Sequence, residues 1–447
     1  MSAPADVVAI GCGPFNLGLA ALASTVDDLD VVVLEARPEL RWHSGMMFGD
    51  ALLQVSFLAD LVTLVDPTHP LSFLAYLRDA DRLYPFYVRE RFHPTRREYE
   101  DYLRWAASRL PVRFSHDVTS VRWAGDRFVV SGTGVSGAGF SVEARHLVLG
   151  VGTTPSVPTA LTGLGDRLVH SSAYLHREVT ADRVTVVGSG QSGAEIVLDL
   201  LRRNLDGGPA VTWLTRTPVF APLDYTKLVL EMTTPSYVRH FHSLPQDRRD
   251  AVRAEHWRHY RAISAETLEE LHDLLYRREW EHGLAPVELR PGVAVTSSST
   301  SAESGEVVLT CAHRDTGRTF RHHTDLVVAA TGYGQAPTPF LAPLEPLVRR
   351  DEQGRYVVAL DHSIALDPSV TGRVFVANAD LHSHGVAAPD LGIGAVRNAT
   401  IVNAVTGREV YRLPKHTAYT SFGAPGDDGG RRDGRSGRDG RSGDDGD

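Results

Sequence analysis

Apolar runs, glycine turns and helical patterns follow one another in the same order twice along this chain. The first apolar run, 6–10, leads into the turn GCGP at 11–14, a helical pattern over 16–24 and a second apolar run at 30–35. Apolar runs of this length predict buried strands, and a glycine turn between strand and helix is typical of a dinucleotide-binding unit. We therefore predict a strand–helix–strand unit near the N-terminus.

The same order returns in the middle of the chain. An apolar run at 184–187 leads into GSGQSG at 188–193, a helical pattern over 194–203 and another strand pattern at 211–215. Two such units predict two dinucleotide-binding domains, each built on a parallel sheet. The predicted fold class is α/β, with two Rossmann-like dinucleotide-binding domains and a small, mostly helical region.

The rest of the chain divides into a helical stretch, further strands and a polar end. Residues 224–283 follow a helical pattern rich in aromatic residues and histidine, and strand patterns return at 307–310 and 326–330. From residue 423 the sequence reads GAPGDDGGRRDGRSGRDGRSGDDGD, which has no apolar residue after Pro425. Such a segment cannot bury enough apolar surface to offset the entropy lost on ordering. We therefore predict that residues 423–447 form a disordered tail.

Composition and charge narrow the class of protein. The 447 residues are 42% hydrophobic and 23% charged, as in ordinary soluble globular proteins, and the formal net charge of −9 argues against a nucleic-acid partner. No apolar run reaches the roughly 18 residues of a membrane span, and no basic segment precedes the first apolar run as it does in a signal peptide. We predict a cytoplasmic protein with neither a nucleic-acid nor a membrane partner.

The cysteines and histidines argue against several redox and metal chemistries. Cys12 and Cys311 cannot build a disulfide framework, and Cys12 lies in a glycine turn, so a reduced compartment is expected. The absence of a CxxC pair argues against a disulfide reductase. His382 and His384 look most like metal ligands, but no carboxylate pattern accompanies them, so no metal site is predicted.

The first glycine turn has the features of an FAD or NAD site. Gly11 and Gly13 allow backbone amides to approach a pyrophosphate at a helix N-terminus, although Asn16 replaces the third glycine of the usual motif. Glu35 ends the second strand, where an acid binds a ribose 2′-hydroxyl and repels a 2′-phosphate. The alternative is a tight turn with a structural role only.

The second glycine turn has the features of an NADPH site. Gly188, Gly190 and Gly193 match the full motif spacing, and Arg216 follows the second strand where the first unit has an acid. A guanidinium suits a 2′-phosphate, although Arg216 alone is also compatible with a solvated surface residue. Together the two sites predict a flavoprotein reduced by NADPH.

Six runs of more specific sequence occur in a fixed order between Val7 and Phe422. They are GCGPFNLGLAAL (11–22), RWHSGMMF (41–48), LLQVSFLADLVTLVDPTHPLSFLAYL (52–77), GSGQSGAE (188–195), ATGY (330–333) and HSHGVAAPDLGIGAVRNATIVNAV (382–405). Together they resemble the N-hydroxylating flavin monooxygenases. That family includes the lysine and ornithine N-monooxygenases and the diamine N-monooxygenases of hydroxamate siderophore synthesis.

The resemblance implies a domain organisation and an assembly. It implies an FAD-binding domain split in sequence, an inserted NADPH-binding domain, a helical substrate-binding region, and a homotetramer or dimer. We place the FAD domain at 1–170 and 335–422, the NADPH domain at 171–222 and 292–334, and the substrate region at 223–291.

The resemblance also implies a reaction. NADPH reduces FAD, the reduced flavin captures O2 as a C4a-hydroperoxide, and a neutral amine nitrogen attacks the distal oxygen. The amine must lose its proton, which desolvation in an apolar pocket favours. The predicted reaction is N-hydroxylation of one primary amine.

Several residues are assigned to the cofactor sites through the resemblance. Gln54 matches a glutamine that lies against the flavin ring, and it is the predicted catalytic residue, although an amide satisfied by backbone is the alternative. Trp42 and His43 match an aromatic–histidine pair beside the flavin, and Ser383-His384-Gly385 match a Thr-His-Gly segment that approaches it. The full set of predicted cofactor-binding residues is Gly11, Gly13, Pro14, Glu35, Trp42, His43, Gln54, Gly188, Gly190, Gln191, Ser192, Gly193, Arg216, Thr331, Gly332, Tyr333, His384 and Gly385.

Ala59 predicts a substrate without a carboxylate. The lysine and ornithine hydroxylases of the family have a lysine at this position, in the run SFLKDL, and that lysine contacts the substrate carboxylate. Leu230 and Gly392 likewise fall where an asparagine and a serine hold the amino-acid end. The resemblance therefore implies a diamine, cadaverine first and putrescine second, with Asp390 and Glu231 as candidate acceptors for the second ammonium.

Other functions remain open at this stage. If Ala59 is only a small helix residue and Lys227 contacts the carboxylate, the substrate is L-lysine or L-ornithine. A flavin monooxygenase of ketones or sulfides would share both nucleotide sites, but not the sequence of residues 52–77. A non-catalytic NADP-sensing redox flavoprotein on the same scaffold is the lesser alternative.

Overall fold

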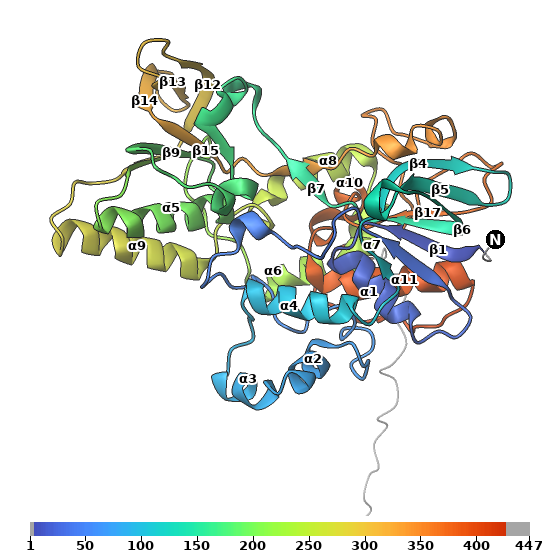
Figure 1. Ribbon diagram of the computed structural model, residues 1–447. Helices are drawn as coiled ribbons and strands as arrows, with labels where there is room; N and C mark the ends of the chain where they lie inside the picture. Colours follow the sequence, from blue (N-terminus) through green and yellow to red (C-terminus); the bar gives the residue numbers. More distant parts are fainter. Residues whose placement is uncertain (1–3, 426–447) are drawn as a thin grey trace, which may run out of the picture.

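The computed structural model describes residues 4–425, which fold around two main β-sheets (Figure 1). The predicted tail therefore lies outside the described residues, except for residues 423–425. None of the helices within 4–425 is long and apolar enough to cross a membrane.

The first sheet has seven strands in the order β3-β2-β1-β6-β5-β4, with β17 also paired to β6. Strands β3, β2, β1, β6 and β17 run parallel, whereas β4 and β5 form an antiparallel extension. The strands are β1 (Ala5–Ile10), β2 (Val31–Leu34), β3 (Val112–Arg113), β4 (Asp117–Trp123), β5 (Phe128–Thr133), β6 (Gly139–Leu149) and β17 (Val374–Val376).

Helices cover one face of this sheet and close a large apolar core (Figure 1). Helix α1 (Pro14–Ala23) packs against α11 (Gly394–Thr406) at close range, because a Cβ on Gly18 would lie only 2.6 Å from the Asn398 amide nitrogen. Helix α4 (Arg96–Ala107) lies beside α1, and a second apolar core fills the other face.

The second sheet is parallel, in the order β11-β10-β9-β15-β8, and α5 (Gln191–Leu205) and α9 (Ala265–Trp280) pack on it. An antiparallel sheet of three strands, β12-β13-β14, adjoins it. The strands are β8 (Leu168–His170), β9 (Arg183–Val187), β10 (Ala210–Leu214), β11 (Glu288–Arg290), β12 (Val293–Thr300), β13 (Val307–His313), β14 (Thr319–Thr324) and β15 (Leu326–Ala329).

The chain crosses between the two sheets along a short antiparallel pair, β7 (Thr153–Pro155) and β16 (Tyr333–Gln335). Two predicted boundaries need correction. Strand β8 pairs with β15 and β11 pairs with β10, so both strands belong to the second sheet. The boundary predicted after residue 170 is therefore too late, and the one predicted after residue 291 cuts off β11. The remaining boundaries stay predictions.

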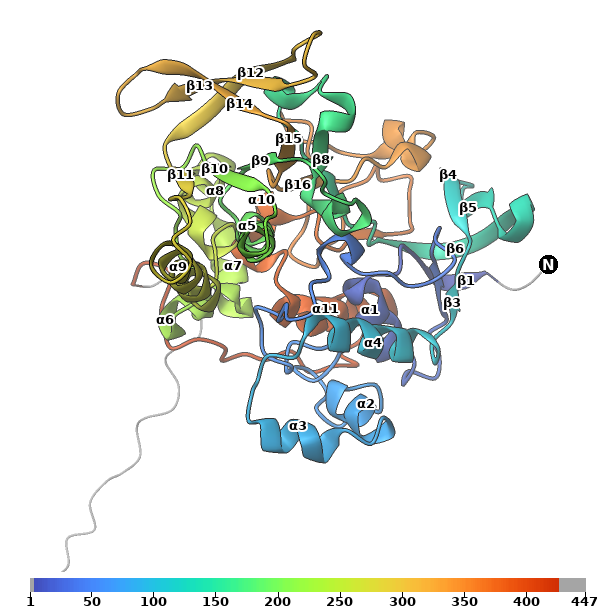
Figure 2. The ribbon, with the colours of Figure 1, turned by 60° about the vertical axis from the view of Figure 1, so that its left-hand side comes forward.

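Short helices lie beside the junction of the two sheets (Figure 2). Helix α7 packs against α10, and α8 also contacts α10. The helices are α6 (Lys227–Leu230), α7 (Pro235–Ser243), α8 (Gln246–Glu255) and α10 (Leu381–His384). Helices α2 (Phe73–Asp79) and α3 (Leu83–Arg89) project from the other helices, and the buried side of α2 belongs to the large apolar core of the first sheet.

Candidate functional site

The first glycine turn leaves the N-terminus of α1 open. Gly11 has φ 95°, and a Cβ there would overlap the carbonyl oxygen of Gly150, so no other residue fits. Gly13 caps α1 without a side-chain hydrogen bond, Pro14 occupies its first turn, and nothing lies within 4 Å of a Cβ built on Gly13. The free backbone N–H groups at this end fit a pyrophosphate.

The departure from the glycine motif at Asn16 has a structural reason. The buried Asn16 amide donates to the carbonyl oxygens of Ile10 at 3.0 Å and Gly11 at 2.8 Å, which fixes the end of β1. The Glu35 carboxylate accepts from the backbone N–H of Cys12 at 2.7 Å, so the acid is attached to the same turn. The hydrogen bond holds the Glu35 carboxylate beside the turn, and its role as a ribose ligand stays a prediction.

The second turn is tighter than the first. Gly188 has φ 121°, and a Cβ there would overlap the carbonyl oxygen of Ala330. A Cβ on Gly193 would lie 2.5 Å from the carbonyl oxygen of Gly188, and Gly190 caps α5 without a side-chain bond. Arg216 follows β10, is exposed, and makes no ion pair with any residue of 4–425. A free guanidinium at this place suits a 2′-phosphate.

Gln191 uses its side chain within the protein. Its amide nitrogen donates to Glu195 at 2.9 Å and Thr267 at 2.8 Å, and its amide oxygen accepts from the Ser264 N–H at 2.8 Å. Gln191 and Ser192 form the first turn of α5, where backbone N–H groups are free to bind a ligand. We therefore keep their contact with the cofactor as a prediction, made through the backbone.

The segment Thr331-Gly332-Tyr333 is held by the protein on both sides. The Thr331 hydroxyl donates to the Ser156 carbonyl at 2.6 Å, and the Gly332 carbonyl accepts from the His170 ring at 3.0 Å. The Tyr333 ring stands edge-on to His170, with centroids 5.2 Å apart. These bonds hold β16 beside β7, so the three residues have a structural role at the crossing between the two sheets. Their contact with a cofactor stays a prediction.

The predicted flavin-side residues Trp42 and His43 lie together. Their ring centroids are 4.6 Å apart, and the Trp42 ring also lies 5.3 Å from Tyr99. His43 is exposed and has φ 51°, a left-handed conformation uncommon for residues other than glycine. Trp42 therefore contributes to the core and still positions an exposed imidazole.

Gln54 lies in a segment that has neither a helix nor a regular strand. The segment is fixed by backbone hydrogen bonds from Leu53 to Pro94 at 2.9 Å and from Phe57 to Phe92 at 2.8 Å. The Gln54 amide nitrogen is buried and has no hydrogen-bond partner within residues 4–425. Because an unpaired buried donor costs about 1–3 kcal/mol, a bound acceptor is the expected partner, as the flavin assignment requires.

Ala59 is buried in the same segment with 7% of its surface exposed, and it is not part of a helix. The interpretation of Ala59 as a small helix residue is therefore wrong. The neighbouring Asp60, which the sequence analysis missed, accepts hydrogen bonds from Val62, Thr63 and Phe73 and so fixes the fold of this segment.

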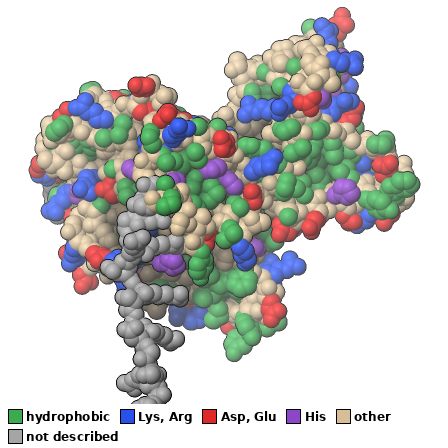
Figure 3. Space-filling view, turned by 180° about the vertical axis from the view of Figure 1, so that it is seen from behind, with side chains coloured by type: hydrophobic (Ala, Val, Ile, Leu, Met, Phe, Trp, Pro, Cys, Tyr) green, Lys and Arg blue, Asp and Glu red, His purple; other side chains and the backbone are tan. Residues whose placement is uncertain are grey.

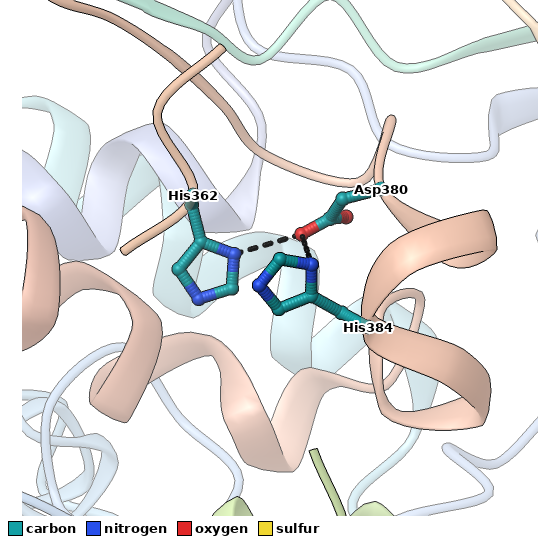
Figure 4. Close-up of side chains that lie close together, drawn as sticks. All are labelled: His362, Asp380 and His384. Atoms are coloured by element: carbon teal, nitrogen blue, oxygen red, sulfur yellow. Dashed lines mark hydrogen bonds and ion pairs between the residues drawn. The ribbon is translucent and has the colours of Figure 1, made fainter. Parts of the chain in front are cut away.

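His384 belongs to a buried cluster with His362 and Asp380 (Figure 4). The Asp380 carboxylate accepts from His362 Nδ1 at 2.8 Å and lies 3.6 Å from His384 Nδ1. Burial raises the pKa of Asp380, but the nearby Arg397 charge and the His362 bond outweigh it and hold the pKa below its usual range. The pKa of His384 lies well below its usual value, mainly because the imidazole is buried, and second because a charge on the neighbouring His362 would repel the charge of a protonated His384.

The cluster corrects the statement that no carboxylate accompanies the C-terminal histidines, because Asp380 lies one helical turn before His384. His382 is not a member, since its Nε2 bonds the Tyr356 carbonyl at 2.7 Å. The His362 and His384 rings stack with centroids 4.1 Å apart and planes 23° apart. Both ring Nδ1 atoms face the same oxygen of Asp380, at 2.8 and 3.6 Å, so the three side chains form one buried hydrogen-bonded and ion-paired network.

Arg397 was also missed in the sequence. It is 1% exposed, its Nη2 donates to the Ala388 carbonyl at 2.6 Å, and its guanidinium lies 4.6 Å from the Phe15 ring centroid. It therefore joins the C-terminal segment to the first glycine turn. Gly385, with φ 69° and ψ −157°, connects the two parts of that segment in a conformation open mainly to glycine.

The predicted substrate residues divide into two groups. Leu230 ends α6, and Glu231 beside it accepts hydrogen bonds from the backbone of Tyr419 and Thr420 at 2.9 Å and from the Thr420 hydroxyl. Glu231 thus holds the C-terminal segment, and its assignment as an ammonium acceptor stays a prediction. Asp390 remains a candidate, and burial raises the pKa of its carboxyl.

Gly392 makes room for Asp390. The Asp390 carboxylate accepts from the Gly392 N–H at 2.6 Å, and a Cβ on Gly392 would lie 2.9 Å from the same carboxylate oxygen. A serine at this position would press on that oxygen, so the glycine and the acid are structurally linked.

Sequence comparisons match this chain over most of its length. A family described as L-lysine 6-monooxygenase/L-ornithine 5-monooxygenase matches residues 3–335. The rhizobactin siderophore biosynthesis protein RhbE of Rhizobium meliloti is 41% identical over 94% of this chain and 95% of its own. The putrescine N-hydroxylase of Shewanella oneidensis is 37% identical over 93% of this chain and 84% of its own.

Structure comparisons agree. DfoA bound to FAD, the desferrioxamine-pathway cadaverine monooxygenase of Erwinia amylovora, matches with a TM-score of 0.90 and 39% identity, over 95% of this chain and 99% of its own. An ornithine N-hydroxylase of Kutzneria with reduced FAD, NADP+ and L-ornithine matches with a TM-score of 0.83 and 28% identity, over 91% and 99% of the two chains.

Proposed function

The chain belongs to the L-lysine 6-monooxygenase/L-ornithine 5-monooxygenase family, and from this premise we propose that it N-hydroxylates one primary amine of an aliphatic diamine. The predicted family, fold class and cofactors are confirmed: the protein is an α/β flavin monooxygenase that uses FAD and NADPH. It is an enzyme of N-hydroxylation in siderophore biosynthesis, so the NADP-sensing alternative is not supported.

One observation carries the choice of a diamine: the buried Ala59 stands where, by resemblance, the amino-acid hydroxylases have a lysine. A carboxylate in this pocket would lack a pairing of about 4 kcal/mol at 4 Å and an effective dielectric of 20, while its desolvation would still be unfavourable. A substrate that ends in CH2 and an amine meets no such penalty.

Gly392 and Asp390 support the same choice at the other end of the substrate. The glycine replaces the serine that, by resemblance, holds the amino-acid end, and it leaves space for the Asp390 carboxylate. An ionised carboxylate in a mostly buried position can accept a charge-assisted hydrogen bond from the distal ammonium.

We place cadaverine before putrescine, and the related cadaverine monooxygenase and putrescine N-hydroxylase support both. One methylene changes discrimination by only about 1–3 kcal/mol, so both diamines are substrates on this account. The proposal includes the route through a flavin hydroperoxide and assembly as a homo-oligomer.

A parallel assay of hydroxylamine formation with cadaverine, putrescine, L-lysine and L-ornithine tests the substrate. We expect both diamines to have a higher kcat/KM than either amino acid. Hydroxylamine is measured, and not NADPH oxidation alone, because uncoupled turnover also consumes NADPH. If L-lysine or L-ornithine were turned over more efficiently than both diamines, the alternative substrate would replace our proposal.

The role of Gln54 can be separated from flavin binding. Gln54→Ala should keep bound FAD but release more hydrogen peroxide per NADPH consumed, because an amide that protects the reactive flavin edge is lost. Gln353→Ala, which removes an exposed glutamine, is the control. An unchanged peroxide yield in Gln54→Ala would make Gln54 a structural amide.

A further inference from the structure

The last described part of the chain connects the helices of the first sheet to the helices α6 and α7. Residues 411–422, which we call the C-terminal strap, run from the end of α11 to the side of α6 and α7 (Figure 2). Gly407 follows α11 with φ 67°, so the chain can turn away from the helix before the strap begins. Figure 3 shows the face on which the described chain ends, with histidine side chains around that end.

The strap begins at a fixed point on α1 and α11. The Asn403 side chain of α11 bonds both backbone groups of Tyr411: its amide nitrogen donates to the carbonyl at 2.7 Å, and its oxygen accepts from the N–H at 2.9 Å. The Tyr411 hydroxyl donates to the Leu22 carbonyl of α1 at 2.7 Å. The start of the strap therefore cannot move independently of the first sheet.

The other end of the strap is attached to the turn between α6 and α7. One Glu231 carboxylate oxygen accepts from the Tyr419 N–H at 2.9 Å, and the other accepts from the Thr420 N–H at 2.9 Å and from the Thr420 hydroxyl. The Thr417 hydroxyl accepts from the Ser236 N–H at 3.0 Å and lies 2.6 Å from the Ser236 hydroxyl. Both oxygens of Glu231 are thus engaged by the strap, in charge-assisted hydrogen bonds.

Phe422 extends this attachment toward the predicted flavin side. Its ring stands edge-on to Tyr237 with centroids 4.9 Å apart and stacks on His240 at 6.2 Å. The Tyr237 ring lies 6.1 Å from Phe241, and a Cβ on Gly385 would lie only 3.0 Å from the Phe241 ring. Two rings of α7 therefore connect the end of the strap to the segment that contains His384.

The turn that the strap holds has little else to fix it. Helix α6 has four residues and the 3-10 helix η6 (Glu231–Thr233) has three, and neither contains a buried residue. Helices this short are not stable alone, since isolated helices need about 12–15 residues. On the inner side η6 contacts η10 (Gly385–Ala387), and on the outer side it contacts the strap through Glu231. Leu230, a predicted substrate residue, lies in this turn.

We propose that the C-terminal strap positions the substrate site, and that Glu231 acts on the substrate through the strap and not by direct contact. The strap holds α6 and α7 against the segment of Gly385. The proposal rests on the proposed function in placing the amine beside Leu230 and Asp390, but the attachment of the strap does not depend on which amine binds. Release of the strap lets α6 move, which weakens amine binding and admits water to the flavin.

Two truncations of the FAD-loaded enzyme test the proposal. Removal of residues 417–447 deletes the contacts with α6 and α7, whereas removal of residues 426–447 leaves every described residue in place. The longer deletion should raise the KM for the amine about ten-fold and increase the peroxide released per NADPH, with FAD content and the KM for NADPH unchanged. It should also speed amide hydrogen exchange in residues 227–243. The shorter deletion should behave as the unmodified enzyme does.

A double-variant comparison tests the role of Glu231. Glu231→Ala should raise the KM for the amine about ten-fold in the full chain and cause no further rise in the chain that lacks residues 417–447, because both changes remove the same contact. A direct ammonium acceptor would instead give a further rise in the shortened chain, and that result would overturn the proposal. Within an intact strap, Thr420→Val should raise the KM about two- to ten-fold, and Thr420→Ser, which keeps the hydroxyl, should restore it.

The KM is measured with whichever of cadaverine, putrescine, L-lysine and L-ornithine is turned over most efficiently. Preference for an amino acid would therefore overturn the diamine assignment and leave the test of the strap intact. A longer deletion that lowers the melting temperature but leaves the KM for the amine unchanged would overturn the proposal, because the strap would then only stabilise the fold. If that deletion loses FAD, Thr420→Val and Thr420→Ser decide, and equal KM values for the two would overturn the proposal.

Discussion

The two nucleotide-binding units share one strand–helix–strand topology, but they differ in whether the predicted ligand residue is already held by other residues of the protein. In the first unit, Glu35 bonds the Cys12 N–H at 2.7 Å and Asn16 seals the strand end, so the acid and the turn form one fixed structure. In the second, Arg216 is exposed and makes no ion pair within residues 4–425. A ligand held in place by the protein suits a cofactor that stays bound, and an exposed, unpaired charge suits one that must bind and leave.

The two units are joined by a nearly buried ion pair. Arg96 at the start of α4 forms two hydrogen bonds to Glu195 of α5, at 2.6 and 2.8 Å, and the two side chains are 13% and 11% exposed. The contact fixes the orientation of one site relative to the other, which hydride transfer between two cofactors requires.

Removing this link should have the largest effect on stability. Arg96→Met leaves Glu195 charged and nearly buried, so the free energy of unfolding should fall by about 3–5 kcal/mol. Arg290→Met breaks an exposed pair with Glu288, whose side chains are 46% and 49% exposed, and should have little effect. Melting temperatures at saturating FAD measure both, and equal shifts would contradict the structural role of the Arg96–Glu195 pair.

Gly188→Ala should impair NADPH binding at the second unit and leave FAD binding at the first unit unchanged. The added Cβ overlaps the Ala330 carbonyl, so the turn must move, and kcat/KM for NADPH should fall about 100-fold while FAD content is kept. Gly207→Ala is the control, because Gly207 also has a positive φ of 83° but open space around its Cβ position. Normal NADPH use by Gly188→Ala would show that the turn tolerates displacement.

Arg216→Ala should weaken the binding of NADPH and leave the binding of NADH unchanged. It removes the charge-assisted contact to the 2′-phosphate that we predict, a kind of contact worth about 1.5–3 kcal/mol, so the KM for NADPH should rise about ten-fold or more. The KM for NADH, which has no such phosphate, should not change. Arg321→Ala, at another exposed arginine of the same domain, controls for general charge loss, and a parallel rise in both KM values would place the phosphate elsewhere.

The smallest predicted effect is a pH dependence of stability that comes from His384. Burial holds its folded-state pKa well below the ordinary value of 6.5, so the unfolded chain binds the proton more readily. Stability is therefore fully present above about pH 6.5 and is lost as pH falls below it, by about 1.4 kcal/mol per unit. His384→Gln should flatten the decline in melting temperature between pH 7 and 5, and His272→Gln, at an exposed histidine, should not.

Local patterns predicted the parts of the fold that depend on near neighbours. Each glycine turn lies within a few dozen residues of its flanking strands and of the residue that ends the second strand, Glu35 or Arg216, and the structure places these parts as the patterns indicate. Strands β8 and β11 were not predicted, because a strand of three residues is too short to show a hydrophobic period.

Long-range pairs could not be predicted in this way. Arg96 and Glu195 are 99 residues apart, and His362 and Asp380 come from different loops that only the folded sheet brings together. The role of Asp60 is equally invisible in sequence, because its partners are mostly backbone N–H groups.

Cofactor preference of the unmodified enzyme tests the contrast between the two units most directly. With saturating cadaverine and measured FAD content, kcat/KM should be at least about ten-fold higher for NADPH than for NADH, because only NADPH carries the 2′-phosphate that Arg216 is predicted to bind. Equal values for the two nucleotides, with FAD fully bound, would contradict the assignment of the second unit as the site that reads the 2′-phosphate.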